Sequence, residues 1–375
     1  MDLDELDARW FALLRRRLLV WYRKHGRDLP WRRTRDAYRI WISEIMLQQT
    51  TVAAVIPYFE RFLDQFPTVQ DLARAEEQDV LRLWEGLGYY SRARNIHKAA
   101  RLVVEQHAGV FPKSAEELQK LPGIGRYTSG AISSFAFDTA APIIEANTLR
   151  LYCRLLGFEG DPRAKAGQDL LWKFAERVLP GKAPGELNQA TMELGGTVCS
   201  VKEPACDECP LRPCCRAFAA GSTSGIPRPK ARPEITDVTH VNVIVRKRGT
   251  VLLRQHGDDE RWSGLWDFPR YELPRELAAT LPDDLTSPSL FGSTKGLTEF
   301  LRSEIQQQTG IDAEIGAYAT SLTHAVTRYR IRLLCFEAEC VSGRLRRGEP
   351  LKWVKPASLE GFPLSTTARK LTRFA

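Results

Sequence analysis

Residues 121–130 read Leu-Pro-Gly-Ile-Gly-Arg-Tyr-Thr-Ser-Gly, which predicts two helices joined by a tight turn. Pro122 and Gly123 end the first helix, Gly125 frees the turn, and apolar residues recur at helical spacing from Thr128 onward. Backbone N–H groups at the start of the second helix stay unpaired, so the turn is a small site for an anion such as phosphate. For this motif alone, a helix–helix corner without a ligand is an equal alternative.

The bulk properties of the chain are compatible with two packed cores. It has 375 residues, of which 43% are hydrophobic, and its net charge of +8 makes a polyanionic partner plausible. The acidic start, Met-Asp-Leu-Asp-Glu, lacks the pattern of a signal peptide, and no apolar run reaches membrane-spanning length. We therefore expect a soluble cytoplasmic protein with no membrane partner.

Basic and aromatic residues alternate near the start of the chain. Residues 9–39 contain eleven Lys or Arg against two Asp or Glu, with five Trp and Tyr side chains between them. This pattern fits a solvated helix face with its aromatics in the core. It fits equally a surface that follows a phosphate backbone.

One carboxylate interrupts an apolar helix predicted over residues 40–58. Glu44 lies among isoleucine and methionine side chains, so it is either on the solvated side of the helix or stripped of water. In the second case its pKa rises and it can hold a proton near neutral pH. Gln48, Gln49 and Thr50 form a polar helix end that suits contacts with base edges or sugars.

Paired tyrosines lie on a glycine loop at residues 84–95, Trp-Glu-Gly-Leu-Gly-Tyr-Tyr-Ser-Arg-Ala-Arg-Asn. Aromatic side chains on such a loop, next to arginines, can wedge into a stack of bases. A tyrosine pair that fills the core is the alternative.

Four cysteines form a compact set with the spacing C-x6-C-x2-C-x5-C, namely Cys199, Cys206, Cys209 and Cys215. Four thiolates so close in sequence can hold a tetrahedral zinc ion or a cubane iron–sulfur cluster, and such clustering indicates a reducing compartment. Cys214 adjoins Cys215 and could replace it as the fourth ligand.

Composition divides the chain into two regions. Residues 221–236 are rich in Gly, Ser and Pro and form the predicted linker. It joins a helical region, residues 1–220 with the cysteine loop at 199–215, to a domain at 237–375. In that domain valines alternate with polar residues from Val241, and one helix is predicted over residues 298–308, so we expect an α+β fold.

Together these motifs closely resemble the helix-hairpin-helix DNA glycosylases with an iron–sulfur loop, and among them the adenine DNA glycosylase (MutY) family. The matching pieces are residues 43–50, Ser-Glu-Ile-Met-Leu-Gln-Gln-Thr, residues 86–92, Gly-Leu-Gly-Tyr-Tyr-Ser-Arg, the hairpin and the four cysteines. Residues 262–269, Trp-Ser-Gly-Leu-Trp-Asp-Phe-Pro, resemble the first strands of that family's Nudix-like lesion-reading domain. The resemblance implies a mainly α glycosylase fold with a [4Fe-4S] cluster, followed by an α+β Nudix-like domain.

The resemblance also implies an enzyme that removes adenine, mispaired with 8-oxoguanine or guanine, from double-stranded DNA and so starts base-excision repair. The adenine must swing out of the duplex, because its glycosidic bond is buried in the stack. By the match, Gln49 and Tyr89 would fill or wedge the gap, beside the polar Gln48. Gly123 and Gly125 would bind phosphate. The residues that would shape the adenine pocket are Arg27, Leu29, Trp31 and Gln189.

Two carboxyl groups would perform the chemistry. Glu44 would protonate the adenine ring, because adenine is a poor leaving group as an anion. A second carboxylate would stabilise the oxocarbenium charge on the sugar, and the family's Asp-Gly-Asn is Glu145-Ala146-Asn147 here. Glu is one methylene longer than Asp, and Ala146 lacks the backbone freedom of glycine. We predict that Glu145 is the functional replacement, with Asn147 ordering the water and the carboxylate.

Tyr127 occupies the hairpin position at which the related endonuclease III group has a lysine. That lysine attacks the sugar and leads to strand cleavage through a Schiff base, which a tyrosine cannot do. We therefore place Tyr127 in the catalytic set and predict a monofunctional glycosylase.

The second domain resembles a decayed Nudix fold. Residues 303–311 match the Nudix box, with Gln307 and Gln308 in place of its metal-binding glutamates. Neutral amides hold magnesium poorly, so we expect a binding role. Leu322-Thr323-His324 stands where the family has a Phe-Ser-His loop, so Thr323 and His324 would read 8-oxoguanine. A His324 that only caps a strand end is the alternative.

Other functions fit parts of the pattern. The Glu145-Ala146 pair is also compatible with a glycosylase for another mispaired base, or with a protein that binds damaged DNA without cleaving it. An iron–sulfur electron carrier would leave the hairpin, Gln49 and the tyrosine loop unexplained. We expect a monomer that associates with DNA in the cytoplasm.

Overall fold

The computed structural model describes residues 3–179, 181–229, 234–281 and 295–375. The chain divides into two compact units, Met1–Ala75 with Asn95–Ala231, and Glu76–Arg94 with Arg232–Ala375. Residues 230–233 of the predicted linker lie outside the described residues. Within the described ranges, no helix has both the length and the apolar character needed to cross a membrane.

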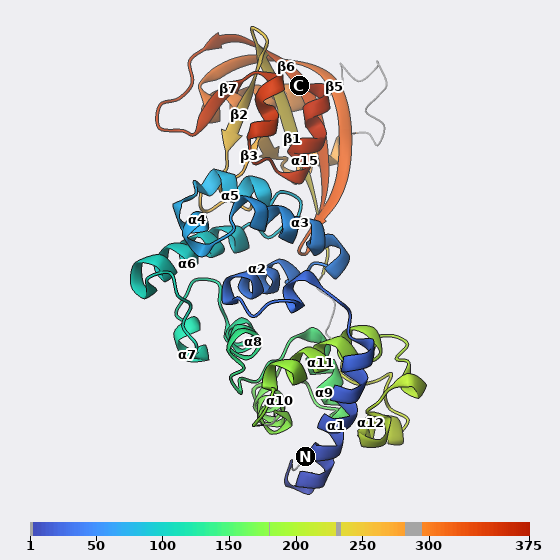
Figure 1. Cartoon of the computed structure of the whole chain (residues 1–375). Helices are drawn as coiled ribbons and strands as arrows, with labels where there is room; N and C mark the ends of the chain where they lie inside the picture. Colours follow the sequence, from blue (N-terminus) through green and yellow to red (C-terminus); the bar gives the residue numbers. More distant parts are fainter. Residues whose placement is uncertain (1–2, 180, 230–233, 282–294) are drawn as a thin grey trace. The chain divides into compact units, whose positions relative to one another are not determined.

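The first unit is built from helices (Figure 1). The α-helices are α1 (Ala8–His25), α2 (Ala37–Leu47), α3 (Val52–Gln65), α4 (Val69–Arg74), most of α6 (Ser91–His107), α7 (Ala115–Leu118), α8 (Arg126–Phe137), α9 (Ala146–Leu156), α10 (Lys165–Val178), α11 (Pro184–Thr197) and α12 (Arg216–Ala219). Short 3₁₀ turns lie at Leu3–Glu5, Pro30–Arg32, Cys206–Glu208 and Arg212–Cys214.

Two features of this unit position the candidate site. Apolar stripes of α1, α9, α10 and α11 pack into one core, which includes Phe11, Leu14 and Leu18 of α1. Helix α8 is buried along residues 128–136 and packs against both α2 and α11. The residues at the start of α8 are therefore held between those two helices.

The predicted hairpin is present as α7, a turn and α8. Gly123 has a φ of +78°, and a Cβ there would come within 2.8 Å of Asn95 Cβ, so a larger residue would be strained and crowded. Gly125 is the N-cap of α8 and has open space where a Cβ would point. The backbone at the start of α8 is thus accessible on that side.

The prediction of one helix over residues 40–58 was wrong in its middle. Helix α2 ends at Leu47 and α3 begins at Val52. Between them Gln49 adopts a φ of +58°, which is uncommon for a residue other than glycine. Thr51 caps α3 with its side chain, so a polar N-cap signal was present in the sequence.

The second unit contains a seven-stranded mixed sheet. The strands are β1 (Thr236–Lys247), β2 (Thr250–Gln255), β3 (Trp266–Asp267), β4 (Arg270–Glu272), β5 (Ile311–Val326), β6 (Tyr329–Gly343) and β7 (Leu351–Val354). The order is β3-β2-β1-β6-β5, while β4 pairs with β1 and β7 with β2. Strands β1 and β6 run parallel, and the other pairs are antiparallel.

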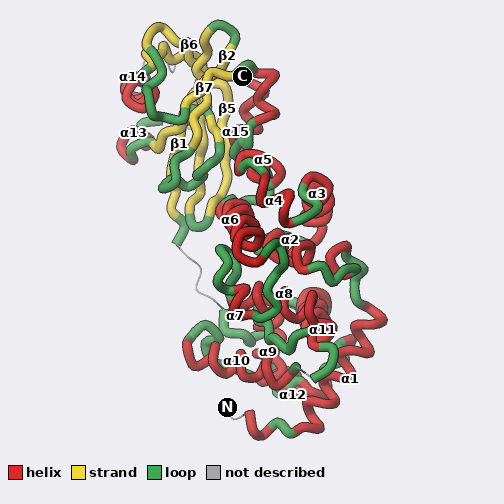
Figure 2. The backbone as a smooth tube through the Cα atoms, turned by 60° about the vertical axis from the view of Figure 1, so that its left-hand side comes forward, coloured by secondary structure: helices red, strands yellow, loops and turns green. Residues whose placement is uncertain are grey.

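Helices cover both faces of this sheet (Figure 2). On one face α14 (Lys295–Thr309) packs Leu297, Leu301 and Ile305 against the odd-numbered valines of β1. On the other face α15 (Thr366–Leu371) packs against a second apolar cluster that includes Ile244. The remaining elements of the unit are α5 (Glu77–Leu83), α13 (Arg275–Ala279) and 3₁₀ turns at Pro356–Gly361 and Thr372–Phe374.

The α+β prediction for this domain is confirmed, with two local differences. Residues 262–269 are not the first strands, because β1 and β2 precede them and only Trp266–Asp267 is a strand. Thr323 and His324 lie within β5, paired with Arg332 and Ile331 of β6, and do not form a loop. The alternating exposure of β5 after Ala319 identifies a strand with one half-buried and one exposed face.

Candidate active site

A cavity of about 670 Å³ in the first unit brings most of the predicted site residues together. Its size is that of a small-molecule pocket. It is lined by residues from α2, the turn after α2, the starts of α8 and α9, and α11. The predicted residues on its wall are Arg27, Leu29, Trp31, Glu44, Gln48, Gln49, Gly125, Tyr127, Glu145, Asn147 and Gln189.

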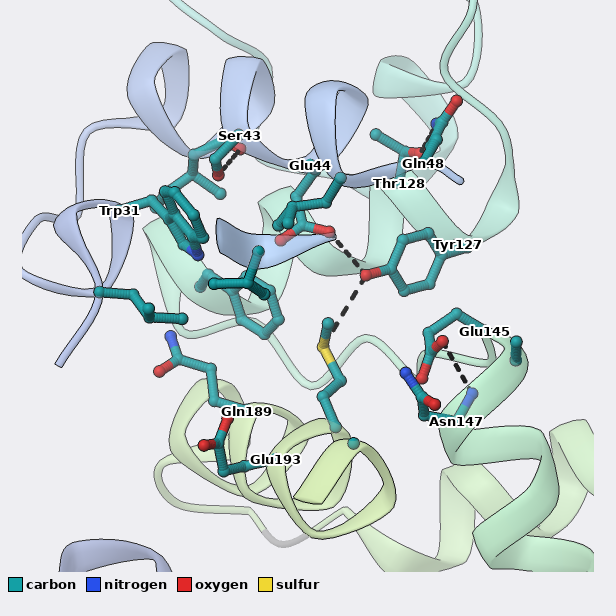
Figure 3. A pocket seen from close by; sticks show the side chains of 18 of the residues that line it. Trp31, Ser43, Glu44, Gln48, Tyr127, Thr128, Glu145, Asn147, Gln189 and Glu193 are labelled. Atoms are coloured by element: carbon teal, nitrogen blue, oxygen red, sulfur yellow. Dashed lines mark hydrogen bonds between the residues drawn. The ribbon is translucent and has the colours of Figure 1, made fainter. Parts of the chain in front are cut away.

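Glu44 enters the cavity from α2 as a buried acid. Its carboxylate accepts a hydrogen bond of 2.6 Å from the Tyr127 hydroxyl (Figure 3). Burial raises the pKa of Glu44 to about 7, since the hydrogen bond from Tyr127 only partly opposes it and the charge of Glu145 adds to it. Glu44 can therefore hold and release a proton near neutral pH.

Glu145 enters the same cavity at the start of α9. Its two carboxylate oxygens accept hydrogen bonds from the backbone N–H groups of Asn147 and Thr148, each at 2.8 Å, and Thr148 Oγ1 accepts a hydrogen bond of 2.8 Å from the Glu145 N–H. Burial raises the pKa of Glu145, and the two backbone N–H groups oppose that rise. The extra methylene of Glu is used to bring the carboxylate back onto the helix start, where it caps α9.

Asn147 is fixed next to that cap. Its side-chain oxygen accepts a hydrogen bond of 2.8 Å from Arg150, whose guanidinium also donates to the carbonyls of Gly195 and Cys199. The side-chain amide of Asn147 keeps its N–H donors for the cavity.

The predicted adenine-pocket residues form one end of the cavity. Trp31 and Leu29 are buried and supply apolar surface. Gln189 projects from α11, and its oxygen accepts a hydrogen bond of 2.7 Å from the Tyr22 hydroxyl. In Figure 3, Trp31 and Gln189 lie toward the end of the cavity away from Glu145 and Asn147.

Three polar residues of this region were missed by the sequence analysis. Glu193 has a fully buried side chain and accepts charge-assisted hydrogen bonds from Arg27 at 2.6 Å and from Arg32 at 2.7 Å. Burial raises the pKa of Glu193, but these arginines outweigh it and hold that pKa below its usual value. Because Glu193 lies four residues after Gln189 on one helix, helical spacing could have indicated it. Nothing in the sequence indicated Tyr22 or Arg32.

The residues predicted to bind phosphate and to fill the gap in the duplex lie at different points around the cavity. Gln48 donates a long hydrogen bond of 3.5 Å to Thr128, and Gln49 has the left-handed backbone described above. Gly123 lies in the hairpin turn and is absent from the cavity wall. A left-handed backbone at a residue other than glycine tends to occur at functional sites, which fits the role predicted for Gln49.

Tyr89 belongs to the second unit and projects from the loop between α5 and α6. It is 49% exposed and has a φ of +48°. Arg92 braces this loop by donating to the carbonyls of Leu87 and Gly88, each at 3.0 Å. The tyrosine is therefore presented on a rigid, exposed turn, and it does not fill the core.

His324 lies on β5 with both ring nitrogens buried and without a hydrogen-bond partner among the described residues. Burial and the nearby Arg270 lower its pKa to about 4, so the ring is neutral at pH 7. Thr323, its neighbour along the strand, is exposed and lines a different cavity. The two side chains thus point to opposite faces of β5.

Four cysteines surround a small cavity in the first unit. Cys199, Cys206, Cys209 and Cys215 line it, whereas Cys214 is buried in the adjoining apolar core. In the described part of the chain, no three His, Cys, Asp or Glu side chains are placed to ligate one metal ion. A tetrahedral zinc ion would need sulfurs at about 2.3 Å from a single point. A purely thiol donor set spread around a cavity fits a multi-iron cluster better, because each thiolate then binds its own iron.

Arg154 braces this cysteine loop from α9. Its buried guanidinium lies 3.2 Å from Cys199 Sγ and donates to the carbonyls of Ser200, Val201, Thr223 and Ile226. The first residues of the predicted linker are thereby packed onto the first unit.

Comparison with known families agrees with this architecture. The family model described as HhH-GPD superfamily base excision DNA repair protein matches residues 42–177, and a NUDIX domain model matches residues 240–373.

Curated relatives extend the similarity. The chain is 38% identical to the adenine DNA glycosylase of Buchnera aphidicola subsp. Schizaphis graminum, over 68% of this chain and 74% of that protein. It is 46% identical to the adenine DNA glycosylase of Rattus norvegicus, over 57% of this chain and 44% of that protein. The chain therefore spans less than half the length of the mammalian relatives that it matches.

Solved structures show the same helical fold. A thermostable thymine-DNA glycosylase is 27% identical, with a TM-score of 0.53, and the match covers 56% of this chain and 98% of that protein. An endonuclease III trapped as a covalent intermediate with DNA has a TM-score of 0.50 at 22% identity, over 58% of this chain and 99% of that protein.

Proposed function

Since the chain belongs to the adenine DNA glycosylase family, we propose that it removes adenine from double-stranded DNA by hydrolysing the N-glycosidic bond. The adenine is mispaired with 8-oxoguanine or guanine, and its removal starts base-excision repair. The observation that supports this most directly is the pair Glu44 and Glu145, two carboxyl groups in different environments on the wall of one cavity.

The reaction begins when the adenine leaves the base stack and enters the cavity. Gln49 takes up the space that the adenine vacates, and the open backbone N–H groups at Gly125 hold a phosphate of the same strand. Gly123 gives the hairpin turn that brings those groups to the surface. Tyr89, on the exposed loop of the second unit, wedges into a base stack.

Glu44 then donates its proton to a ring nitrogen of adenine, which makes the base a neutral leaving group. Its pKa of about 7 suits this step, because a substantial fraction is protonated at neutral pH. Tyr127 keeps the carboxyl group oriented through its hydrogen bond.

As the bond to the sugar breaks, positive charge develops on the pentose. The Glu145 carboxylate stabilises that charge while the start of α9 holds the carboxylate in place. Asn147 orders the water that attacks the sugar carbon, and a proton passes from this water to the carboxylate. Tyr127 has no amine, so the sequence of steps ends with an abasic site and an intact strand.

The cysteine loop would hold a [4Fe-4S] cluster through Cys199, Cys206, Cys209 and Cys215. The cluster would supply a covalent cross-link for residues 199–215, which adjoin the helices carrying Asn147 and Gln189. The protein acts as a monomer on DNA. In the second unit His324 reads 8-oxoguanine with a neutral imidazole that can donate and accept hydrogen bonds, whereas Thr323 lies on the opposite face of β5 and does not share that contact.

A single-turnover assay tests the proposal. Purified protein is incubated with duplexes that carry adenine opposite 8-oxoguanine, guanine or thymine, and with a thymine–guanine duplex, and abasic sites are counted after alkali. We expect release of adenine opposite 8-oxoguanine and guanine and none from the other two duplexes. Tight binding without release would identify a damage-binding protein, and release of thymine would identify a glycosylase of different specificity.

A further inference from the structure

The loop that presents Tyr89 belongs to the second compact unit, although it interrupts the helical region in the sequence. That unit joins Glu76–Arg94 to Arg232–Ala375. The first of these segments contains α5 and the connection from α5 to α6, residues 84–90, which we call the wedge loop. Helix α5 lies beside α15 in both Figure 1 and Figure 2. The same unit therefore contains Tyr89 and the Nudix-like domain.

Hydrogen bonds within the wedge loop set its local shape. Tyr89 has a φ of +48°, a left-handed conformation that residues other than glycine rarely adopt. Such conformations persist only where the surroundings hold them. Trp84 Nε1 donates to the Gly88 carbonyl at 3.2 Å, and Arg92 donates to the same carbonyl at 3.0 Å. The direction in which this shape points depends on how the loop is attached to the domain.

An ion pair attaches the wedge loop to α15. The Glu85 carboxylate accepts hydrogen bonds from Arg369 Nε at 2.7 Å and from Arg369 Nη2 at 2.8 Å, and a longer one of 3.4 Å from the Leu364 N–H. The side chains of Glu85 and Arg369 are 17% and 29% exposed, so water and salt screen the pair only in part. A two-point bond between guanidinium and carboxylate fixes direction as well as distance.

Arg369 is itself held in place by the domain. Its guanidinium also donates to the carbonyls of Leu359 and Phe362, at 3.0 and 2.7 Å. These carbonyls belong to the 3₁₀ turn Pro356–Gly361 and to the residue that follows it. Arg369 cannot follow a movement of Glu85 without losing both bonds, so the ion pair ties the wedge loop to a fixed point.

Further contacts attach the segment on either side of the loop. Gln78 of α5 accepts a hydrogen bond of 2.9 Å from Trp266 Nε1 and donates one of 3.2 Å to the Gly264 carbonyl. After the loop, Arg94 donates to the Ser263 carbonyl. Glu85 is the member of this set that lies within the wedge loop, four residues before the tyrosine.

Helix α15 also contacts the part of the domain predicted to read the lesion. Thr367 of α15 accepts a hydrogen bond of 3.2 Å from Arg270. Burial, and after it the positive charge of Arg270, lower the pKa of His324. Leu322, on the same face of β5 as His324, packs against the apolar cluster that includes Ala368 of α15. One short helix therefore joins the wedge loop to the strand that carries His324.

We propose that Glu85 and Arg369 are positioning residues that fasten the wedge loop to the Nudix-like domain, so that this domain presents Tyr89 to the base stack. This rests on the proposed function, in which Tyr89 wedges into DNA. Without the ion pair the loop shifts relative to α15, and the tyrosine ring loses its fixed direction.

The test measures how much Tyr89 contributes to DNA binding with and without the ion pair. The full chain binds a duplex that carries a non-hydrolysable 2′-fluoro adenosine opposite 8-oxoguanine, so no reaction intervenes. Tyr89→Ala should weaken binding by about tenfold or more, the usual effect of removing an aromatic ring that stacks on a base. In an Arg369→Met background the same change should weaken binding by less than about threefold, because a loosely held ring rarely inserts.

A fluorescent base reports insertion separately from affinity. 2-Aminopurine is placed on either side of the 8-oxoguanine in two duplexes, where breaking its stacking raises its fluorescence. Saturating wild-type protein should raise the signal in at least one duplex, and Tyr89→Ala should abolish that rise. Arg369→Met should lose most of it. A double variant, Glu85→Gln with Arg369→Met, should lose no more, because the two residues act as a pair.

Arg246→Met is the matched control. Arg246 is 29% exposed, as Arg369 is, and its ion pair with Glu337 at 3.4 Å joins β1 to β6 instead of the wedge loop. The control should leave the Tyr89 effect and the fluorescence unchanged. Thermal unfolding shows whether each variant is folded, and Glu85→Gln gives the same comparison from the other side of the pair if Arg369→Met does not fold.

Two results would overturn the inference. One is an undiminished effect of Tyr89→Ala in the Arg369→Met background, and the other is an equal loss of fluorescence in Arg369→Met and Arg246→Met. A wild-type protein without any Tyr89-dependent signal would overturn the wedge role together with the inference. A wild-type protein that gives the signal but releases no adenine from an ordinary duplex would refute the proposed reaction alone.

Discussion

Replacing Glu145 with Gln removes the charge that the proposed reaction needs while keeping the shape of the side chain. The Glu145 carboxylate would act on a sugar cation at a distance of about 4 Å. With an effective dielectric constant of about 20, that interaction is worth about 4 kcal/mol. Since each 1.36 kcal/mol is a factor of ten, adenine release should fall roughly a thousandfold.

The substitution also weakens the helix cap. Asn147 and Thr148 each donate a backbone N–H to one carboxylate oxygen, and an amide has an oxygen for only one of them. The loss should lower the free energy of unfolding by about 1 kcal/mol, the usual size of an N-cap effect. Thermal unfolding of the variant must show that it is folded before its rate is interpreted.

Single-turnover release of adenine opposite 8-oxoguanine is the assay. Asp7→Ala is the matched control, because the Asp7 carboxylate caps α1 by accepting a hydrogen bond of 2.8 Å from the Trp10 N–H and lies outside the cavity. It should lose stability and keep the rate. Glu145→Asp should retain most of the activity, since the charge remains and Asp is a good N-cap. If Glu145→Gln works within tenfold of the wild type, the electrostatic role of Glu145 is refuted.

Four further outcomes test other parts of the site. Adenine release should fall about tenfold per pH unit above pH 7, because Glu44 donates its proton only when it is protonated. Tyr127→Phe should move this limb of a pH–rate profile to higher pH, because the wild-type hydrogen bond from Tyr127 holds the pKa of Glu44 down and its removal lets that pKa rise. Glu44→Gln should raise the melting temperature more at pH 8 than at pH 4. The wild-type protein has its full stability while Glu44 is protonated, below pH 4.5, and loses stability as the pH rises through about 7, whereas the uncharged Gln does not titrate. Borohydride should trap no protein–DNA adduct, and trapping in high yield would contradict the assignment of Tyr127. Cys215→Ser should lose iron and the visible absorbance of a cluster while Cys214→Ser keeps both, because Cys214 packs in the core, and equal losses would reverse the ligand assignment.

The parts of the fold that the sequence predicted are those with local signals. The hairpin at Gly123 and Gly125 depends on conformations that glycine favours, and the cysteine spacing is a property of one short loop. Helix α14 and strand β1 follow from apolar periodicity of 3.6 and 2 residues. Each of these features is decided within about fifteen residues of chain.

The parts that it missed depend on contacts between distant segments. The break at Gln49 falls in the polar stretch 48–51 between two apolar segments, and the helical spacing of those flanking segments extended the predicted helix through it. The hydrogen bond between Tyr22 and Gln189 joins residues 167 positions apart. Neither residue type is unusual in its own helix, so only the packing of α1 against α11 reveals the pair.

The two carboxyl groups show why the departure at residue 145 is compatible with the reaction. Both are buried, and burial raises both pKa values, so burial alone would leave two similar acids. The hydrogen bonds that the two carboxyl groups accept make them different. Glu44 accepts one from a phenol, whereas Glu145 accepts two from the start of a helix, whose dipole also favours an anion. Glu44 is therefore the proton donor and Glu145 the ion. These two roles are set by where α2 and α9 place the carboxyl groups. The extra methylene of Glu145 leaves its carboxylate at the start of α9, so the anionic role is preserved.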